Sequence, residues 1–155
     1  MKAALWYDRN DVRVEEIDEP EVKKGYVKVK IKWCGICGSD LHEYLGGPIF
    51  IPVGKPHPLS GSTAPVVLGH EFSGNVVEVG DGVSKFKEGD RVIVEPMVVC
   101  GKCPACLEGK YNLCESLGFH GLCGSGGGFA EYTQKNMCTR YLIACHMRRP
   151  RLLNL

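Results

Sequence analysis

The sequence lacks the features that mark membrane and exported proteins. No apolar run approaches the roughly 18 residues that a membrane-spanning helix needs, and the N-terminus has neither the basic region nor the apolar stretch of a signal peptide. We therefore expect a cytoplasmic protein. In that reducing compartment, its nine cysteines are expected to act as thiolate ligands rather than to form disulfides.

Acidic residues are missing from one end of the chain. From Gln134 onward there is none, whereas the same segment carries five basic residues, Lys135, Arg140, Arg148, Arg149 and Arg151. The net charge of +1 therefore hides a main body with 14 basic and 18 acidic residues. This mildly acidic body argues against nucleic acid or an anionic membrane as the partner of the protein.

The chain also lacks the G-x-G-x-x-G turn with which dinucleotide-binding domains seat a pyrophosphate between a strand and a helix. The glycine-rich segment 124–128 precedes a strand-like segment, so we interpret it as a turn. The sequence therefore predicts no dinucleotide-binding site in this chain.

Glycine and short alternating segments are abundant instead. The 155 residues, 20 of them glycine, suffice for one domain with its own core. Strict alternation over 27–32 predicts a strand with one buried face, and similar patterns predict strands at 1–7, 12–17, 72–79, 91–95 and 129–133. A short helix capped by Ser39 is expected at 39–44, followed by a long irregular loop at 46–65. The fold class expected is mainly β, a barrel of short strands with long functional loops.

Four cysteines are spaced as metal ligands. Cys100, Cys103 and Cys106 follow one another at intervals of two residues, and Cys114 comes after a gap of seven. Four thiolates on one loop can close a tetrahedron around a structural zinc. An iron–sulfur cluster is the main alternative, but its pattern places the fourth cysteine three residues on, followed by proline. The spacing thus favours zinc, with Lys102 and Lys110 offsetting the thiolate charge.

A second group, Cys37, His42, His70 and Glu71, is less specific taken alone. Each residue has an ordinary structural explanation, as a small core residue, a helix-surface residue or a polar group at a strand end. The surrounding sequence changes this. The segment 34–42, the G-H-E motif at 69–71 with its following glycines, and G-D-R-V at 89–92 stand in order before the four cysteines. Together these four motifs resemble the zinc-containing medium-chain alcohol dehydrogenases over residues 2–133.

This resemblance implies a GroES-like β-barrel catalytic domain, incomplete here, and no Rossmann domain. It implies that Cys37 and His70 bind a catalytic zinc, that Glu71 lies beside or on the metal, and that Ser39 and His42 relay a proton to solvent. Cys34 is expected to be structural. In the family, zinc lowers the pKa of the alcohol, and the alkoxide gives a hydride to NAD. Full-length members are usually homo-oligomers.

The long insert at 46–65 resembles the bacterial (R,R)-2,3-butanediol dehydrogenases in particular. This branch interconverts a vicinal diol with its ketone, acetoin, while sorbitol or threonine dehydrogenases remain alternatives. A non-catalytic zinc-binding module with a basic tail is a further alternative, for which salt-sensitive nucleic-acid binding would be the test.

The C-terminal segment does not fit the resemblance. We expect a domain at 1–133, with a structural-zinc lobe at 95–115, and an aberrant basic tail at 134–155. Codons can be chosen for 137–155 so that the frame starting at the third base of the Met137 codon encodes V-Y-K-I-P-D-S-M-S-Y-E-K-A-A-L-V-E-P, which resembles the family's continuation. The hypothesis is a frameshift in the gene or its sequence record, leaving a fragment that is inactive alone and exposes apolar surface.

Overall fold

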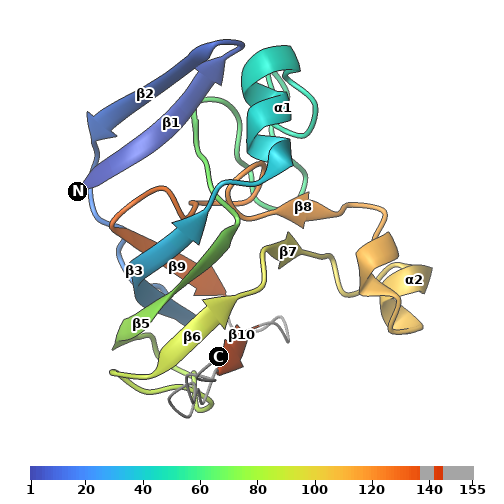
Figure 1. Cartoon of the computed structure of the whole chain (residues 1–155). Coiled ribbons are helices and arrows are strands. Elements are labelled where there is room, and N and C mark those ends of the chain that lie inside the picture. Colours follow the sequence, from blue (N-terminus) through green and yellow to red (C-terminus); the bar gives the residue numbers. More distant parts are fainter. Residues whose placement is uncertain (137–141, 145–155) are drawn as a thin grey trace, which may run out of the picture.

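The computed structural model describes residues 1–136 and 142–144. Most of the predicted aberrant tail therefore lies outside the described residues, and the frameshift hypothesis stays a prediction. Among the described residues, no helix is long and apolar enough to cross a membrane. Strands dominate the chain, and every pairing between named strands is antiparallel within the described ranges. The expectation of a mainly β fold is confirmed (Figure 1).

A five-stranded sheet forms the larger layer, in the order β10-β6-β5-β3-β9. Its members are β3 (Tyr26–Gly35), β5 (Glu71–Val79), β6 (Arg91–Val94), β9 (Tyr132–Asn136) and β10 (Leu142–Ala144). The alternation predicted in β3 is confirmed, because Val27 and Val29 are fully buried while Lys30 faces solvent. Strand β3 pairs with β5 along nearly its whole length, so the start of β5 lies beside the end of β3.

A smaller sheet packs above it, in the order β2-β1-β4 (Figure 1). It consists of β1 (Lys2–Asp8), β2 (Asp11–Glu16) and β4 (Val66–Val67). The indole of Trp6 on β1 is fully buried and its Nε1 donates to the carbonyl of Glu43, at 3.0 Å. This bond ties the small sheet to helix α1 (Gly38–Gly46).

The remaining elements form a lobe that extends from the body in Figure 1. A two-stranded ribbon of β7 (Met97–Val98) and β8 (Gly118–Phe119) leads out to it and back. Between these strands lie α2 (Pro104–Leu107) and the 3-10 turn η1 (Tyr111–Leu113). The loop predicted at 46–65 is confirmed, since no helix or strand falls between α1 and β4.

Two apolar clusters stabilise the body. One draws mainly on strands of the five-stranded sheet and contains Val27, Val29, Phe72, Val76, Phe86, Val92 and Val94. The other lies under the small sheet and contains Trp6, Ile51, Val66, Leu68 and Leu122. Because Ile51 comes from the long loop, the loop is part of the core rather than an appendage.

The last strand differs from its prediction. The strand expected at 129–133 begins at Tyr132 and runs to Asn136. The residues before it pair with β1 of the small sheet instead. Ala130 forms a β-bridge with Ala3, and the carbonyl of Phe129 accepts a hydrogen bond from the amide of Ala4 at 2.8 Å. The chain thus crosses from one sheet to the other here, and alternation alone could not show where the partner changes.

The cap of α1 also differs. Ser39 lies inside the first turn, and the N-cap is Cys37, whose amide donates to the carboxylate of Asp40 at 2.9 Å. An aspartate at the third helical position closes a capping box, which is why the helix begins two residues before the position expected from Ser39.

Gln134 lies on β9, and its buried side-chain oxygen Oε1 has no hydrogen-bond partner among the residues that the structure describes. Leaving such an oxygen unpaired costs about 1–3 kcal/mol. We expect Gln134→Met, which keeps the shape and removes the amide, to raise the free energy of unfolding by about 1 kcal/mol. Urea unfolding followed by circular dichroism measures this. An unchanged or lower free energy of unfolding would show that the amide is satisfied in solution.

Candidate metal centres

The four cysteines of the lobe converge on one point. Cys100, Cys103, Cys106 and Cys114 place their sulfur atoms within 4.8 Å of one another. The sulfurs of Cys100 and Cys106 are 4.0 Å apart, twice the length of a disulfide bond. A tetrahedron with Zn–S bonds of about 2.3 Å has edges of about 3.8 Å, so the cluster has the dimensions of a zinc site.

Backbone amides prepare this cluster for a cation. The amides of Lys102 and Cys103 donate to the sulfur of Cys100 at 3.5 and 3.3 Å and lower the pKa of that thiol to about 6. Desolvation, together with the neighbouring Cys103, raises the pKa of Cys106 to about 12. Four thiolates therefore coexist here only with a bound cation, which supplies the missing positive charge.

The lobe has almost no apolar core of its own. Between residues 95 and 115, the buried apolar side chains are Cys103 and Cys114, both of them members of the cluster. Leu107 and Leu113 point outward, 75% and 62% exposed. A closed metal site is the usual substitute for a core in a segment this small.

The two lysines of the lobe make different contacts. Lys102 reaches the cluster through its backbone amide, and the ammonium of Lys110 pairs with the carboxylate of Glu108 at 2.9 Å. The ammonium of Lys110 thus has a carboxylate partner, and the expectation that it offsets the thiolate charge stays a prediction.

A second group lies where α1 and β5 begin. Ligand atoms of Cys37, His70 and Glu71 are within 4.8 Å of one another. Cys37 follows the end of β3, and His70 and Glu71 stand at the start of β5, which pairs with it. Gly69 makes this possible, because its φ of +91° is in the left-handed region and a Cβ there would lie 2.7 Å from the amide nitrogen of Phe129.

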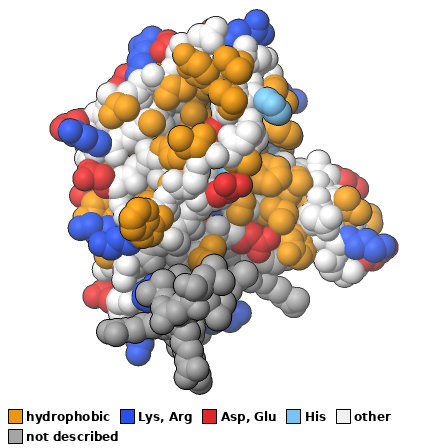
Figure 2. Space-filling view, in the orientation of Figure 1, with side chains coloured by type: hydrophobic (Ala, Val, Ile, Leu, Met, Phe, Trp, Pro, Cys, Tyr) orange, Lys and Arg blue, Asp and Glu red, His pale blue; other side chains and the backbone are white. Residues whose placement is uncertain are grey.

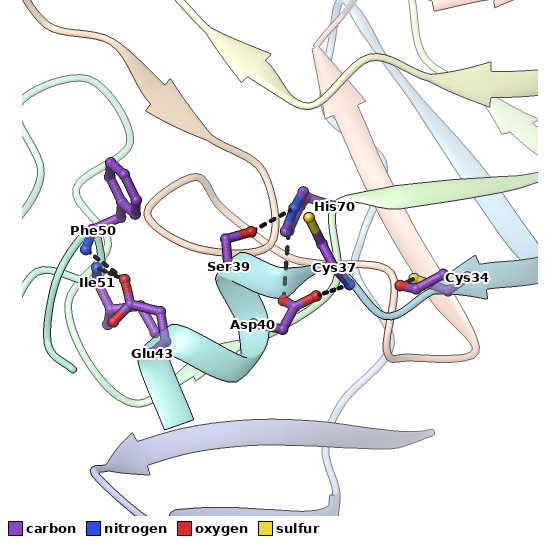
Figure 3. Close-up of polar contacts among 9 residues, drawn as sticks. Cys34, Cys37, Ser39, Asp40, Glu43, Phe50, Ile51 and His70 are labelled. Carbon is purple, nitrogen blue, oxygen red and sulfur yellow. Dashed lines mark hydrogen bonds and ion pairs between the residues drawn. The ribbon is translucent and has the colours of Figure 1, made fainter. Parts of the chain in front are cut away.

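Ser39 and Asp40 of α1 surround the imidazole of His70, as Figure 3 shows. The Ser39 hydroxyl is 3.0 Å from Nε2, and Oδ1 of Asp40 is 3.5 Å from Nδ1. The carboxylate of Asp40 raises the pKa of His70 to about 9, against the opposing effect of burial. Hydrogen bonds from Ser39 and then His70 lower the pKa of the Cys37 thiol.

Oδ1 of Asp40 and Nδ1 of His70 are buried, and neither has a hydrogen-bond partner within the described part of the chain. A metal on the opposite nitrogen of the ring would fix the tautomer with a proton on Nδ1 and complete this pair. This unfinished contact, with a thiol, an imidazole and a carboxylate converging, fits an open catalytic-type zinc site of three protein ligands.

Asp40 was not among the residues predicted from the sequence, although the C-x-x-D capping pattern marks it. We expect Asp40→Asn to weaken zinc binding at this second group by about 10–100-fold, because the imidazole loses its charged partner. Competition with a chromophoric chelator measures the two affinities separately. The exposed Asp81→Asn is the matched control, and equal affinities in both variants would contradict the assignment.

The other predicted residues are placed as follows. Cys34 is half-buried, and burial raises the pKa of its thiol to about 11, which suits a structural residue. His42 is exposed on α1, and no hydrogen bond or ion pair among the described residues joins it to the Cys37 group. Its part in a proton relay stays a prediction.

Glu43 is a further residue that the sequence did not reveal. It is fully buried on α1, and its carboxylate accepts the amides of Ile49, Phe50 and Ile51, the first at 2.9 Å (Figure 3). This fixes the start of the long loop, so that the ring of Phe50 meets Phe119 edge-on at 6.2 Å. A buried carboxylate on a helix has no sequence signature.

The molecule exposes much apolar surface near this site. Figure 2 shows hydrophobic side chains gathered over the upper and right-hand part of the body. Among the residues 33–53, seven large apolar side chains are at least half exposed: Trp33, Ile36, Leu41, Leu45, Ile49, Phe50 and Val53. The expectation of exposed apolar surface is confirmed for the described residues.

Known proteins resemble this chain in sequence and in fold. The chain is 63% identical over 132 residues to (R,R)-butanediol dehydrogenase of Bacillus subtilis, and 51% identical to that of Neisseria gonorrhoeae. These matches cover 85% and 84% of this chain. It is 39% identical over 143 residues to sorbitol dehydrogenase of Bacillus subtilis, covering 92%. The chain spans only 37–38% of the length of these relatives.

The fold agrees with the sequence. The crystal structure of 2R,3R-butanediol dehydrogenase from Bacillus subtilis matches with a TM-score of 0.84 at 59% identity, over 92% of this chain and 39% of that one. Residues 23–140 match the alcohol dehydrogenase GroES-like domain. This chain therefore belongs to the zinc-type alcohol dehydrogenase family, of which it contains the GroES-like domain.

Proposed function

We propose that this chain is the metal-binding part of an NAD-dependent dehydrogenase that interconverts a vicinal diol, such as 2,3-butanediol, and its ketone, acetoin. The observation that carries the proposal is the pairing of two unlike clusters: a closed set of four sulfurs and an open set of one thiol, one imidazole and one carboxylate. A closed set suits a structural metal and an open set a catalytic one. The names of the relatives supply the substrate class.

The residues of the open group have distinct tasks in this proposal. Cys37, His70 and Glu71 would hold the zinc, which when bound makes an alcohol more acidic and polarises a ketone. Ser39, which lies beside Nε2 of His70, would accept the alcohol proton, and the exposed His42 on the same helix would pass it to solvent. Phe50 and Phe119 would shield the apolar end of the diol from water.

The cofactor requires a part of the protein that this chain does not provide. Every pairing of named strands among 1–136 and 142–144 is antiparallel, and the sequence has no dinucleotide-binding turn. We propose that NAD binds to the remaining two thirds of a full-length protein, which would assemble into a homo-oligomer.

The proposal also includes the domain limits, 1–133 for the domain and 95–115 for its lobe. It includes a cytoplasmic location, where thiolates stay reduced.

The experiment compares two forms of the protein. The 155-residue chain is expected to bind up to two zinc ions, yet to show no NAD-dependent oxidation of 2,3-butanediol. A protein whose reading frame is restored from the Met137 codon on is expected to turn over this diol, followed as NADH absorbance. Turnover by the 155-residue chain alone would refute the division of tasks between its parts. No turnover by the restored protein would refute the proposed function.

Sorbitol is the second candidate substrate, because sorbitol dehydrogenase of Bacillus subtilis is 39% identical to this chain. Comparing kcat/KM for 2,3-butanediol and sorbitol in the restored protein separates the two. We expect 2,3-butanediol to be preferred, in keeping with the higher identity to the butanediol enzymes. Sequencing the coding DNA beyond Thr133 tests the frameshift itself.

A further inference from the structure

A cavity of about 310 Å³ lies away from the Cys37 group, between β9 and the segment that leads into the lobe. Its lining includes Lys23, His120, Ser125, Gln134 and Lys135. No aspartate or glutamate lines it. A cavity of this size holds a small molecule. Its ionisable lining among the described residues consists of Lys23, Lys135, His120, Tyr26 and the thiol of Cys100.

The side chain of Lys135 is unusual for a lysine. The residue is only 4% exposed, and its ammonium nitrogen Nζ donates to the carbonyls of Pro96 and Met97 at 3.4 and 3.3 Å. Both bonds are long, and no carboxylate lies within ion-pair distance of Nζ in the part of the chain that the structure describes. A buried lysine without a counter-charge readily gives up its proton.

We propose that Lys135 forms an imine with small anionic carbonyl compounds of the 2-oxo acid class, which the cavity admits. Both lysines line the cavity: the exposed Lys23 would supply a cation for the carboxylate, and the buried Lys135 would supply the nucleophile. No step of the proposed diol oxidation uses this cavity, so the inference does not depend on that function.

The step is balanced without any oxidant. The lone pair of Nζ attacks the carbonyl carbon, and the electron pair of the C=O bond moves to oxygen, which takes one proton from nitrogen. The hydroxyl group then leaves with the second nitrogen proton as water, and a C=N bond remains. Only a neutral amine can begin this sequence.

The surroundings favour the neutral amine. Burial lowers the pKa of Lys135 to about 8, and Glu95 opposes this only in part. The groups around it are His120 from the turn after β8, Lys23 before β3, and Cys100 at the start of the lobe. His120 is itself kept neutral, since burial and then Lys135 lower its pKa. Relative to the ordinary lysine pKa of 10.5, a pKa of about 8 raises the neutral fraction at pH 7 about 300-fold.

Reductive trapping tests the proposal. The zinc-loaded 155-residue chain is incubated at pH 7 with pyruvate and cyanoborohydride, and the modified lysines are mapped by peptide mass spectrometry. We expect Lys135 to be modified at least about 10-fold faster than the exposed Lys30 and Lys32, with the rate rising through pH 8. Equal or slower modification of Lys135 in the unmutated chain would overturn the proposal.

Two variants separate the roles of the lysines. Lys135→Arg keeps a cation and is expected to abolish fast modification, with zinc content and circular dichroism checking the fold. Lys23→Met is expected to slow trapping of pyruvate about 10-fold while leaving that of uncharged acetaldehyde unchanged. If both carbonyl compounds react alike in the unmutated chain and in Lys23→Met, the anionic part of the proposal is wrong.

Discussion

Cys114→Ser is expected to remove one zinc ion per chain and to unfold the lobe between β7 and β8. The sulfur of Cys114 is one of four that converge, and it also accepts the amide of Cys100 at 3.3 Å. Structural zinc contributes about 10–16 kcal/mol in small domains at neutral pH, and the lobe has no other core to replace it. Elemental analysis and limited proteolysis of the segment 99–117 measure the loss.

Cys123→Ser is the matched control for this change. Cys123 is equally buried, 3% exposed against 6% for Cys114, and lies outside both clusters. Its sulfur accepts the amide of Phe119 at 3.2 Å, a bond that a serine oxygen can also accept. The control should keep its zinc and its resistance to protease. If the two variants lost zinc to the same extent, the four-sulfur site would be wrong.

Glu43→Ala is expected to destabilise the body by about 3 kcal/mol or more, which is much of the stability of a domain this size. The carboxylate accepts three backbone amides, and alanine would leave all three without this acceptor, the amide of Ile51 in a buried position and those of Ile49 and Phe50 in part-buried ones. The loop would then release Ile51 from the core under the small sheet. Urea unfolding measures the loss.

Glu43→Gln and Glu88→Ala are the two controls for the loss of stability in Glu43→Ala. The amide of Gln keeps one acceptor oxygen, so a smaller loss of about 1–2 kcal/mol is expected. Glu88 is fully on the surface, and its replacement should change the free energy of unfolding by less than about 0.5 kcal/mol. Equal losses in Glu43→Ala and Glu88→Ala would show that the loop does not depend on this carboxylate.

The candidate metal sites could be predicted from the sequence because residue type and spacing largely determine which side chains can share an ion. Cys100, Cys103, Cys106 and Cys114 need only one short loop to meet, and the structure brings them together. Cys37 and His70 are 33 positions apart, and the sequence linked them only through a resemblance. The antiparallel pairing of β3 with β5 is what makes them neighbours.

The supporting residues could not be predicted in the same way. Asp40 and Glu43 are charged residues on a short helix, which ordinarily face solvent, yet both are buried. Their burial depends on where the loop and β5 pass, which is tertiary information. The same holds for β9, whose start depends on a change of partner between two sheets that no local pattern records.

Because the lobe has almost no apolar core, the folding of the protein in a cell should depend on zinc. Since its buried apolar side chains are Cys103 and Cys114, two of the four proposed zinc ligands, we expect a newly made chain to finish folding there only by capturing an ion. When the ion is scarce, the segment between β7 and β8 stays open as a long accessible stretch, which is what proteases cut. The steady-state abundance of the chain should therefore follow the zinc supply of its host, independently of how stable the rest of the barrel is.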